Sequence, residues 1–319
     1  TQPRSHGGSE AGQLELVVVR ETLAAANAPH RRHAFGPGPG FLAGVEDRLA
    51  KDYLNPLLAG EKRTGFAFTD PAEGPATTAR RDGDGWRIDG CKSYVTGGAE
   101  ADFFGVVARL EAPEEGALFL IVDAAAEGLT CSQPFASMDG SHHVRLDFDG
   151  VRVPADAAVG RPGEGLPRAM RQIGDVRLAL AAEACGLMQW TLEHLETHLG
   201  QPHRGGGTLG DREGVRLRFA DARIDAFAAR SMLYRTARLA DSGENIINEA
   251  MACKVFATEA VGQLVDTAIQ LVGGTALVEG HPLERLYRQV RAWRLAEGAS
   301  DVLRLNIGRG ILELGKGRI

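Results

Sequence analysis

Apolar and polar residues follow three different patterns along the chain, and these patterns predict three domains at 1–64, 65–160 and 161–319. In the last region apolar residues recur every three or four positions, which is the spacing of an amphipathic α-helix. Four segments show this stripe: 178–199, 215–233, 246–271 and 301–314. A shorter helix is expected near 283–288. Because facing apolar stripes pack against one another, the region predicts a four-helix bundle.

The middle region alternates apolar and polar residues, which is the period of a strand with one buried face. Val144, Leu146 and Phe148 alternate in this way, and 103–108 and 117–123 are short apolar runs. Asp-Gly pairs, which favour tight turns, occur at three places: 82–85, 89–90 and 149–150. The region therefore predicts short strands joined by Asp-Gly turns in an antiparallel barrel or sandwich.

The first region is predicted to contain helix and loop. Helices are expected over 15–26 and 45–58, and the Gly-Pro run at 36–40 between them must be loop. The whole chain is thus predicted to be an α+β protein. It would have N-terminal helices, a middle antiparallel β domain and a C-terminal four-helix bundle.

Composition narrows the classes of function. The chain has 319 residues, with 36 Lys and Arg against 42 Asp and Glu, so its net charge is −6. This mild acidity disfavours binding to nucleic acid or to an anionic membrane, because both select clustered positive charge. No apolar run approaches a membrane span, and no signal peptide is recognised. The four cysteines are dispersed and form no CxxC pair, which predicts a reduced, cytoplasmic protein.

Several common catalytic and metal-binding signatures are absent. The sequence contains no Walker loop, GxSxG or HExxH. The glycines at 36–40 follow no strand and alternate with prolines that lack amide donors, so a phosphate loop is disfavoured. His142 and His143 are adjacent in a predicted strand and point to opposite faces, so no metal site is expected there.

Six short segments, spread over most of the chain, carry a more specific signal. They are FAFTDP at 66–71, GCKSYVTGG at 90–98, FDGVRVP at 148–154, GEG at 163–165 leading to Arg177, QLVGG at 270–274 and LAEGAS at 295–300. In this order they resemble landmarks of the acyl-CoA dehydrogenase family, among them Thr-Glu-Pro, GxKxWITN, FxDVxVP, QxxGG and YEGTS. The resemblance covers the chain from about residue 10 to its end.

The resemblance implies an FAD-dependent oxidoreductase that acts on acyl thioesters. In that family a carboxylate removes the proton α to the thioester carbonyl and the β-hydride passes to flavin N5, which yields a 2-enoyl thioester. Burial raises the pKa of a carboxylate and makes it a better base. Glu297 holds the position of the base, Gly298 allows close approach of the substrate, and Arg177 matches a residue near the nucleotide portion of the substrate. The alternatives are a carboxylate at a helix start and a surface arginine.

The resemblance also implies a set of flavin-binding residues. Thr69 and Thr96 match residues that contact the flavin ring, with Thr96 near N5, and Tyr94 replaces a tryptophan that flanks the ring. Phe68 and Val95, which adjoin them, are expected to help hold the flavin as well. Further cofactor positions are expected at Leu209, Gln270, Gly273, Gly274, Ser300 and Asp301. In the family the turn with the glycine pair touches the dinucleotide of a neighbouring subunit, and a helix C-cap is the alternative for that pair.

Several family residues that bind the distal half of the flavin are absent. Gly206 stands where the family has an arginine, and Ala299 replaces a threonine. The family also has two further helices before the point where the resemblance starts. One alternative is therefore a shortened, partly catalytic or non-catalytic subunit of a heteromeric acyl-CoA dehydrogenase. Another is a flavin oxidase or monooxygenase with the same fold.

The implied partners follow from the same resemblance. The substrate would be an acyl-CoA or an acyl-carrier-protein thioester, and an electron-transfer flavoprotein would exchange electrons with the chain. A homo- or hetero-oligomer, either a dimer or a tetramer, is expected because the flavin site of the family spans a subunit interface. No nucleic acid or membrane partner is expected.

Overall fold

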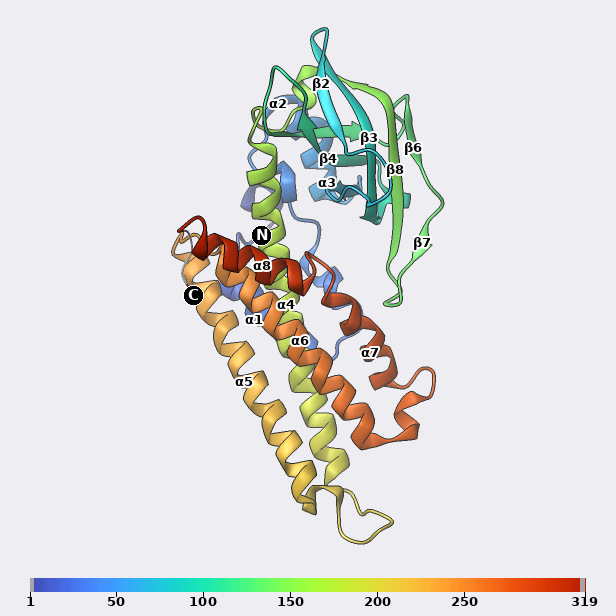
Figure 1. The fold of residues 1–319 in the computed structure, drawn as a ribbon, viewed down its shortest axis with the longest axis vertical. Coiled ribbons are helices and arrows are strands. Elements are labelled where there is room, and N and C mark those ends of the chain that lie inside the picture. The colour runs from blue at the N-terminus through green and yellow to red at the C-terminus, as the bar shows by residue number, and fades with distance from the viewer. Residues whose placement is uncertain (1–2, 316–318) are drawn as a thin grey trace. The chain divides into compact units, whose positions relative to one another are not determined.

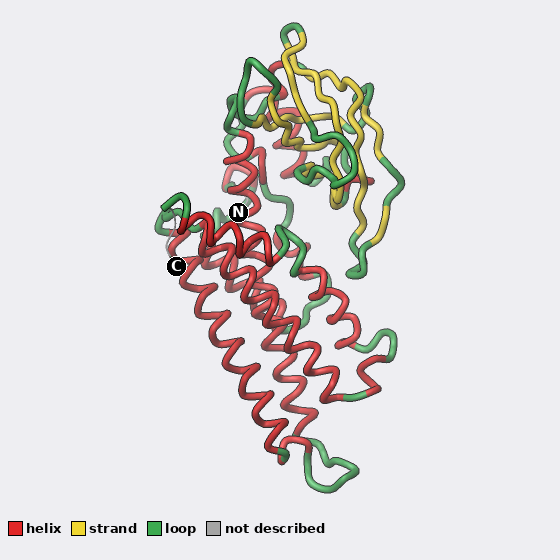
Figure 2. The backbone as a smooth tube through the Cα atoms, viewed as in Figure 1, coloured by secondary structure: helices red, strands yellow, loops and turns green. Residues whose placement is uncertain are grey.

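The computed structural model describes residues 3–315 and residue 319. Its internal contacts separate two compact units. One consists of Thr1–Glu10 with Phe35–Ile173, and the other of Ala11–Ala34 with Gly174–Ile319. The strands lie in the first unit and most of the helical residues lie in the second (Figure 2).

The first unit is built on a mixed β-sheet, with strand labels shown in Figure 1. The strands are β1 (Thr64–Ala67), β2 (Thr78–Asp82), β3 (Gly85–Thr96), β4 (Phe103–Leu110), β5 (Ala117–Asp123), β6 (Leu129–Cys131), β7 (Phe135–Ala136) and β8 (His142–Val153). Their order is β1-β4-β2-β3-β8-β6, with β5 paired to β4 and β7 to β8. Most neighbours are antiparallel, as predicted, but β4 pairs in parallel with β1 and β2. The strands predicted at 103–108 and 117–123 are confirmed.

Two of the three predicted Asp-Gly turns are wrong. The turn between Asp82 and Gly85 forms as expected, whereas Gly90 lies inside β3 and Gly150 lies inside β8. Gly90 has φ 122° and lies at a register shift against β8, where an added Cβ would be 2.5 Å from the carbonyl oxygen of Ala76. This glycine therefore serves a bulge and a close backbone contact. As a result β3 and β8 are long, continuous strands.

Both faces of the sheet are covered by apolar side chains. Phe104 and Val106 of β4 point into one cluster, while Phe103 and Val107 point into another. The second cluster is closed by helical segments between residues 40 and 59: η3 (Gly40–Leu42), α2 (Asp47–Leu49), the π-helical η4 (Ala50–Leu54) and α3 (Asn55–Ala59). The helix predicted at 45–58 is thus confirmed, with a π-helical turn in its middle. The other short turns of the first unit are η1 (Arg4–His6), η5 (Gly98–Glu100) and η6 (Ala155–Ala157), while η2 (Arg31–Phe35) spans the point where the chain passes from the second unit to the first.

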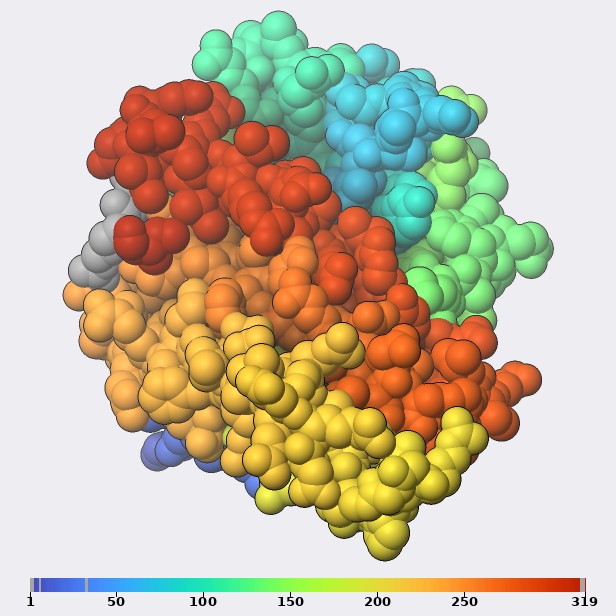
Figure 3. All heavy atoms as spheres, turned by 60° about the horizontal axis from the view of Figure 1, so that its bottom comes forward, coloured from blue at the N-terminus to red at the C-terminus, as the bar shows by residue number. Residues whose placement is uncertain are grey.

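The second unit is a bundle of long helices. Its elements are α1 (Gln13–Ala25), α4 (Gly165–Leu199), α5 (Glu213–Asp241), α6 (Ile247–Val272), α7 (Pro282–Trp293) and α8 (Ser300–Leu312), with the short η7 (Leu209–Asp211) and η8 (Gly274–Leu277). The start of α4 is counted with the first unit. The four predicted amphipathic stripes and the short helix are all confirmed, and so is the helix predicted at 15–26, which is α1. In Figure 3 the surfaces of α5 to α8 run in sequence from yellow to red.

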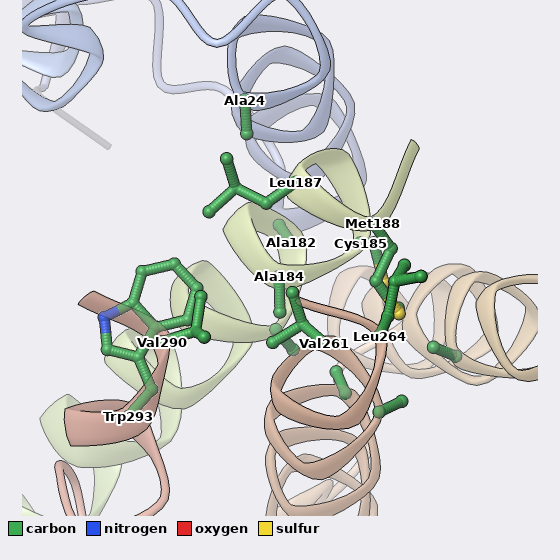
Figure 4. Packing of buried hydrophobic residues seen from close by; sticks show 14 of the residues in the cluster. Ala24, Ala182, Ala184, Cys185, Leu187, Met188, Val261, Leu264, Val290 and Trp293 are labelled. Carbon is green, nitrogen blue, oxygen red and sulfur yellow. The ribbon is translucent and has the colours of Figure 1, made fainter. Parts of the chain in front are cut away.

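Small residues and a buried carboxylate join α1 to the bundle. A Cβ added to Gly186 of α4 would lie 2.2 Å from the carbonyl oxygen of Glu21, so only glycine fits at this contact. The Glu21 carboxylate is buried, lies 2.8 Å from Nε of Arg230 and accepts a hydrogen bond from the hydroxyl of Tyr234. Figure 4 shows Ala24 of α1 close to Leu187 of α4 in the same core.

The described residues contain neither a helix that could cross a membrane nor a cluster of metal-binding side chains. Within residues 3–315 and 319, no helix is long and apolar enough to cross a membrane. Over the same residues, no group of three or more His, Cys, Asp or Glu side chains is arranged to hold a metal ion. His142 is exposed while His143 is half-buried in β8, consistent with side chains that alternate between the faces of a strand.

Candidate active site

Glu297 lies in the turn between α7 and α8, on a strained backbone. Its φ is +57° and that of Gly298 is +103°, so two consecutive residues occupy the left-handed region. A residue with a Cβ reaches that region at a cost of about 1–3 kcal/mol, which the surrounding structure must offset. Part of the offset is a hydrogen bond of 2.9 Å from the Ser300 amide to the Arg294 carbonyl, which closes the turn at the start of α8.

Two buried cations from other helices hold this turn by its backbone. Arg177 of α4 is 7% exposed, and its Nε donates to the carbonyl of Glu297 at 3.0 Å. Lys254 of α6 is 0% exposed, and its Nζ donates to the carbonyl of Gly298 at 2.7 Å and to that of Arg294 at 3.3 Å. The half-buried Glu297 carboxylate accepts no hydrogen bond from any residue that the structure describes. The backbone of the turn is therefore fixed while the carboxylate stays available.

Burial and neighbouring charges together shift the pKa values of the ionisable groups at this turn. Burial raises the pKa of Glu297 above its ordinary value, and the charges of Arg177 and Lys254 offset part of that rise. Burial, together with the charge of Arg177, lowers the pKa of Lys254 to about 8. Burial also lowers the pKa of Arg177. A carboxylate with a raised pKa is a stronger base than an exposed one.

The structure rules out one interpretation of the sequence and adds one residue to the site. Arg177 is not a surface arginine, because its guanidinium is buried against the Glu297 turn. Lys254 was missed altogether. The available signal was a lysine next to Cys253, on the apolar stripe of a helix that is otherwise buried.

In the first unit, a buried lysine fastens the segment after β1 to β3. Lys92 is 2% exposed, and its Nζ lies 2.7 Å from both Asp70 Oδ1 and the carbonyl of Phe68. Burial lowers the pKa of Lys92, while the hydrogen bond and charge of Asp70 oppose that shift. The Ser93 amide also donates to the carbonyl of Thr69 at 2.9 Å. These contacts bring Phe68 and Thr69 beside β3, as the resemblance implied.

Tyr94 and Thr96 present an aromatic ring and a hydroxyl on the surface of the first unit. Tyr94 has φ +56°, lies where β3 shifts register against β8 between Lys92 and Val95, and is 64% exposed. Val95 between them points inward and is 0% exposed. Thr96 is exposed, and its hydroxyl lies 3.1 Å from Nδ1 of His143 on β8. The strand irregularity therefore turns a large aromatic side chain outward next to a polar group.

The remaining predicted cofactor residues lie in two other places. Ser300 and Asp301 begin α8, where Ser300 is buried and Asp301 pairs with Arg304 at 3.5 Å. Leu209 lies in η7 and Gln270 lies near the end of α6, while Gly273 follows that helix and Gly274 begins η8. Along α6, the 16 residues from Lys254 to Gln270 span roughly 24 Å. The chain by itself therefore does not bring Gln270 to the Glu297 turn.

Comparison with known proteins identifies the family. The model of the acyl-CoA dehydrogenase middle domain matches residues 59–151, and that of the acyl-CoA dehydrogenase C-terminal domain matches residues 163–312. Together these matches span most of the chain. The chain belongs to the acyl-CoA dehydrogenase family.

Individual members of the family are similar over nearly the whole chain. The mitochondrial short-chain specific acyl-CoA dehydrogenase of Homo sapiens is 30% identical, over 97% of this chain and 78% of that protein. The caffeyl-CoA reductase-Etf complex subunit CarC of Acetobacterium woodii is 27% identical, over 98% of this chain and 86% of the relative. The structure of glutaryl-coenzyme A dehydrogenase with glutaryl-CoA matches with a TM-score of 0.84 at 25% identity, over 98% of this chain and 83% of that one.

The cofactor of this family is FAD, and the first unit contains residues that fit its ring. An isoalloxazine needs a flat apolar contact and hydrogen-bonding groups at its edge. The uncovered ring of Tyr94 and the exposed hydroxyl of Thr96 supply these two chemistries on one surface. The backbone of Phe68 and Thr69 is fastened to the same strand through Lys92 and Ser93.

Proposed function

We propose that this acyl-CoA dehydrogenase family member interconverts a saturated acyl thioester and its 2-enoyl counterpart, with Glu297 as the general base. One observation carries the proposal. Arg177 and Lys254 hydrogen-bond the Glu297 turn only through backbone carbonyls, which leaves a carboxylate of raised pKa with no hydrogen bond or ion pair among the described residues. A purely structural carboxylate would be engaged in hydrogen bonds or ion pairs.

The proposed reaction assigns two roles to the turn. The Glu297 carboxylate takes the proton from the carbon α to the thioester carbonyl, and the bound FAD supplies the acceptor for the β-hydride. Negative charge then develops on the thioester oxygen and requires a donor. The amide N–H of Glu297 is suited to this role, because it donates no hydrogen bond to any described backbone carbonyl. The small Gly298 allows a thioester to approach the turn closely.

The same residues support either direction of the reaction. The relatives include dehydrogenases and reductases, and a base that removes the α-proton in one direction returns it in the other. For the electron partner we propose an electron-transfer flavoprotein, as the name of the CarC complex suggests. For the substrate we propose a CoA or carrier-protein thioester. We propose a dimer or tetramer, in which Leu209, Gln270, Gly273 and Gly274 would serve the cofactor of a neighbouring subunit.

The purified chain is expected to be yellow. Its visible absorbance should show flavin at one equivalent per chain, and this absorbance should bleach when an acyl-CoA is added without oxygen. A bleached sample that recovers its colour rapidly in air would instead identify an oxidase or monooxygenase.

A colourless chain would favour the second candidate, a subunit that completes its flavin site with a different chain. Gly206 in place of the arginine of the family favours this candidate, because the arginine's charged hydrogen bond to phosphate contributes about 1.5–3 kcal/mol. Recovery of the colour on mixing with a longer family member would then establish it.

Lys254→Met is expected to raise the pKa of Glu297 further, because the substitution removes one of its two nearby positive charges. The acid limb of the pH profile of kcat/KM should move to higher pH. Lys51→Met, at an exposed position, is the matched control and should leave the profile in place. An unmoved profile in Lys254→Met would mean that Lys254 does not act on the base.

The same variant changes the pH dependence of stability. The pKa of Lys254 is lowered from 10.5 to about 8 in the folded chain, so between these pH values the unfolded chain binds more protons than the folded one. The free energy of unfolding of the wild type should therefore rise relative to that of Lys254→Met as pH increases through this window. Urea unfolding at pH 7.5, 9 and 10.5 measures the difference.

A further inference from the structure

His143 of β8 is the centre of a hydrogen-bonded chain that the proposed reaction leaves unused. It is paired in register with Thr96 of β3, and its Nδ1 lies 3.1 Å from the Thr96 hydroxyl. On the other side of the ring, Nε2 lies 3.1 Å from Oγ of Ser141 and 2.9 Å from Oγ of Ser137. Asp139 ends the chain, with Oδ1 2.6 Å from the Ser141 hydroxyl.

The positions of the protons in this hydrogen-bonded series follow from its last member, the Asp139 carboxylate. Ser141 has one hydroxyl proton, and at 2.6 Å from the Asp139 carboxylate it donates that proton to Asp139. The Ser141 oxygen can then only accept, so the tautomer that satisfies both serine contacts of His143 has its proton on Nε2, shared between Oγ of Ser141 and Oγ of Ser137. In the neutral ring Nδ1 therefore has a lone pair and accepts from the Thr96 hydroxyl.

The ring of His143 is also held by its neighbours. Its centroid is 5.9 Å from that of Tyr94 and 5.7 Å from that of Phe135 on β7. The next residue on the same face of β8 is Arg145, whose guanidinium pairs with Asp147 at 2.8 Å. The imidazole is thus packed by aromatic rings and oriented by hydrogen bonds on both of its nitrogens.

We propose that His143 is a positioning residue that turns the Thr96 hydroxyl into a hydrogen-bond acceptor toward the flavin. The proposal rests on the proposed function and on the family resemblance, which implies that Thr96 lies near flavin N5. Oxidised flavin accepts a hydrogen bond at N5, whereas reduced flavin carries a hydrogen there and donates one. A Thr96 hydroxyl whose proton is held by His143 offers only lone pairs to a ligand. This arrangement favours the reduced cofactor over the oxidised one.

The test compares the flavin midpoint potential of the wild type with that of His143→Phe, which keeps an aromatic ring but removes the acceptor. The Thr96 proton is then free to turn toward the oxidised flavin. At a fixed applied potential, the ratio of reduced to oxidised flavin should fall between about twofold and tenfold, the effect of one hydrogen bond. His142→Phe, on the exposed face of the same strand, is the matched control and should leave the ratio unchanged.

A variant that already lacks the Thr96 hydroxyl distinguishes an effect through Thr96 from a general structural effect of His143→Phe. In Thr96→Val the hydroxyl is absent, so adding His143→Phe should no longer shift the potential. An equal shift in both backgrounds, or no shift in either, would overturn the role of His143. Loss of flavin from the wild-type chain would instead overturn the proposed function, and this inference with it.

A measurement that needs no flavin tests the direction of the hydrogen bonds. In protein labelled with ¹⁵N-histidine, one ring should show a protonated Nε2 and an unprotonated Nδ1, and its signals should disappear in His143→Phe. The unprotonated signal should move in Thr96→Val. A protonated Nδ1 in the neutral ring of His143 would overturn the inference even in a chain that binds flavin.

Discussion

Glu297→Gln is expected to lower kcat by about 10²–10⁴-fold, the range that a positioned general base contributes. Glutamine keeps the size of the side chain and the backbone contacts of Arg177 and Lys254, but it cannot take a proton. The flavin should stay bound and acyl-CoA should still bind. Stopped-flow reduction of the flavin by an acyl-CoA measures the loss directly.

The stability of Glu297→Gln serves as a control for its loss of activity. Burial raises the folded-state pKa of Glu297, so its contribution to stability is present at low pH and is lost as pH rises through that pKa. At pH 7 the neutral glutamine should therefore be at least as stable as the wild type. Glu279→Gln, at an exposed position after η8, should change neither rate nor stability. Normal flavin reduction by Glu297→Gln would remove Glu297 from its proposed role.

Trp293→Ala is expected to have the largest effect on stability, about 3–5 kcal/mol less free energy of unfolding. Trp293 ends α7, is 2% exposed and packs in the core of the bundle (Figure 4). It directly precedes Arg294, whose carbonyl accepts hydrogen bonds from Lys254 and Ser300. The cavity should therefore also loosen the Glu297 turn, and kcat should fall. Urea unfolding followed by circular dichroism measures the first effect.

Tyr287→Ala on the same helix is the matched comparison, because Tyr287 is 39% exposed. The loss of free energy of unfolding in Tyr287→Ala should be well under half of that in Trp293→Ala. Equal losses in the two variants would show that the helix as a whole, and not the buried indole, carries the stability.

The long helices could be predicted closely because their apolar stripes repeat over many turns. The stripes at 178–199 and 246–271 correspond to α4 and α6, although α4 begins earlier, at Gly165. The Asp-Gly pairs were harder, since a positive φ at glycine serves a turn and a bulge equally well. Gly90 and Gly150 became parts of long strands because the strand partner, which lies far along the sequence, fixed the pairing. The parallel pairing of β4 with β1 and β2 depends on the same long-range contacts.

The candidate site was predictable only where a side chain matched a family signature. Glu297, Thr96 and Arg177 were found in this way. Lys254 was missed because its partners are backbone carbonyls about 40 residues further on. Every residue has such a carbonyl, so the sequence does not distinguish the ones that bind a lysine. His143 was noted only as half of a histidine pair. Its contact with Thr96 depends on the register of two strands about 47 residues apart, which local patterns do not specify.

The packing of α1 has a consequence for synthesis of the chain. Glu21 meets its partners Arg230 and Tyr234 on α5, and Tyr234 lies 213 positions after Glu21 in the sequence. At the usual 5–20 residues per second, α1 leaves the ribosome roughly 10–40 s before the helix that receives its carboxylate. During that interval the apolar face of α1 and its acidic group have no native partner on α5. A nascent-chain chaperone would find a target there.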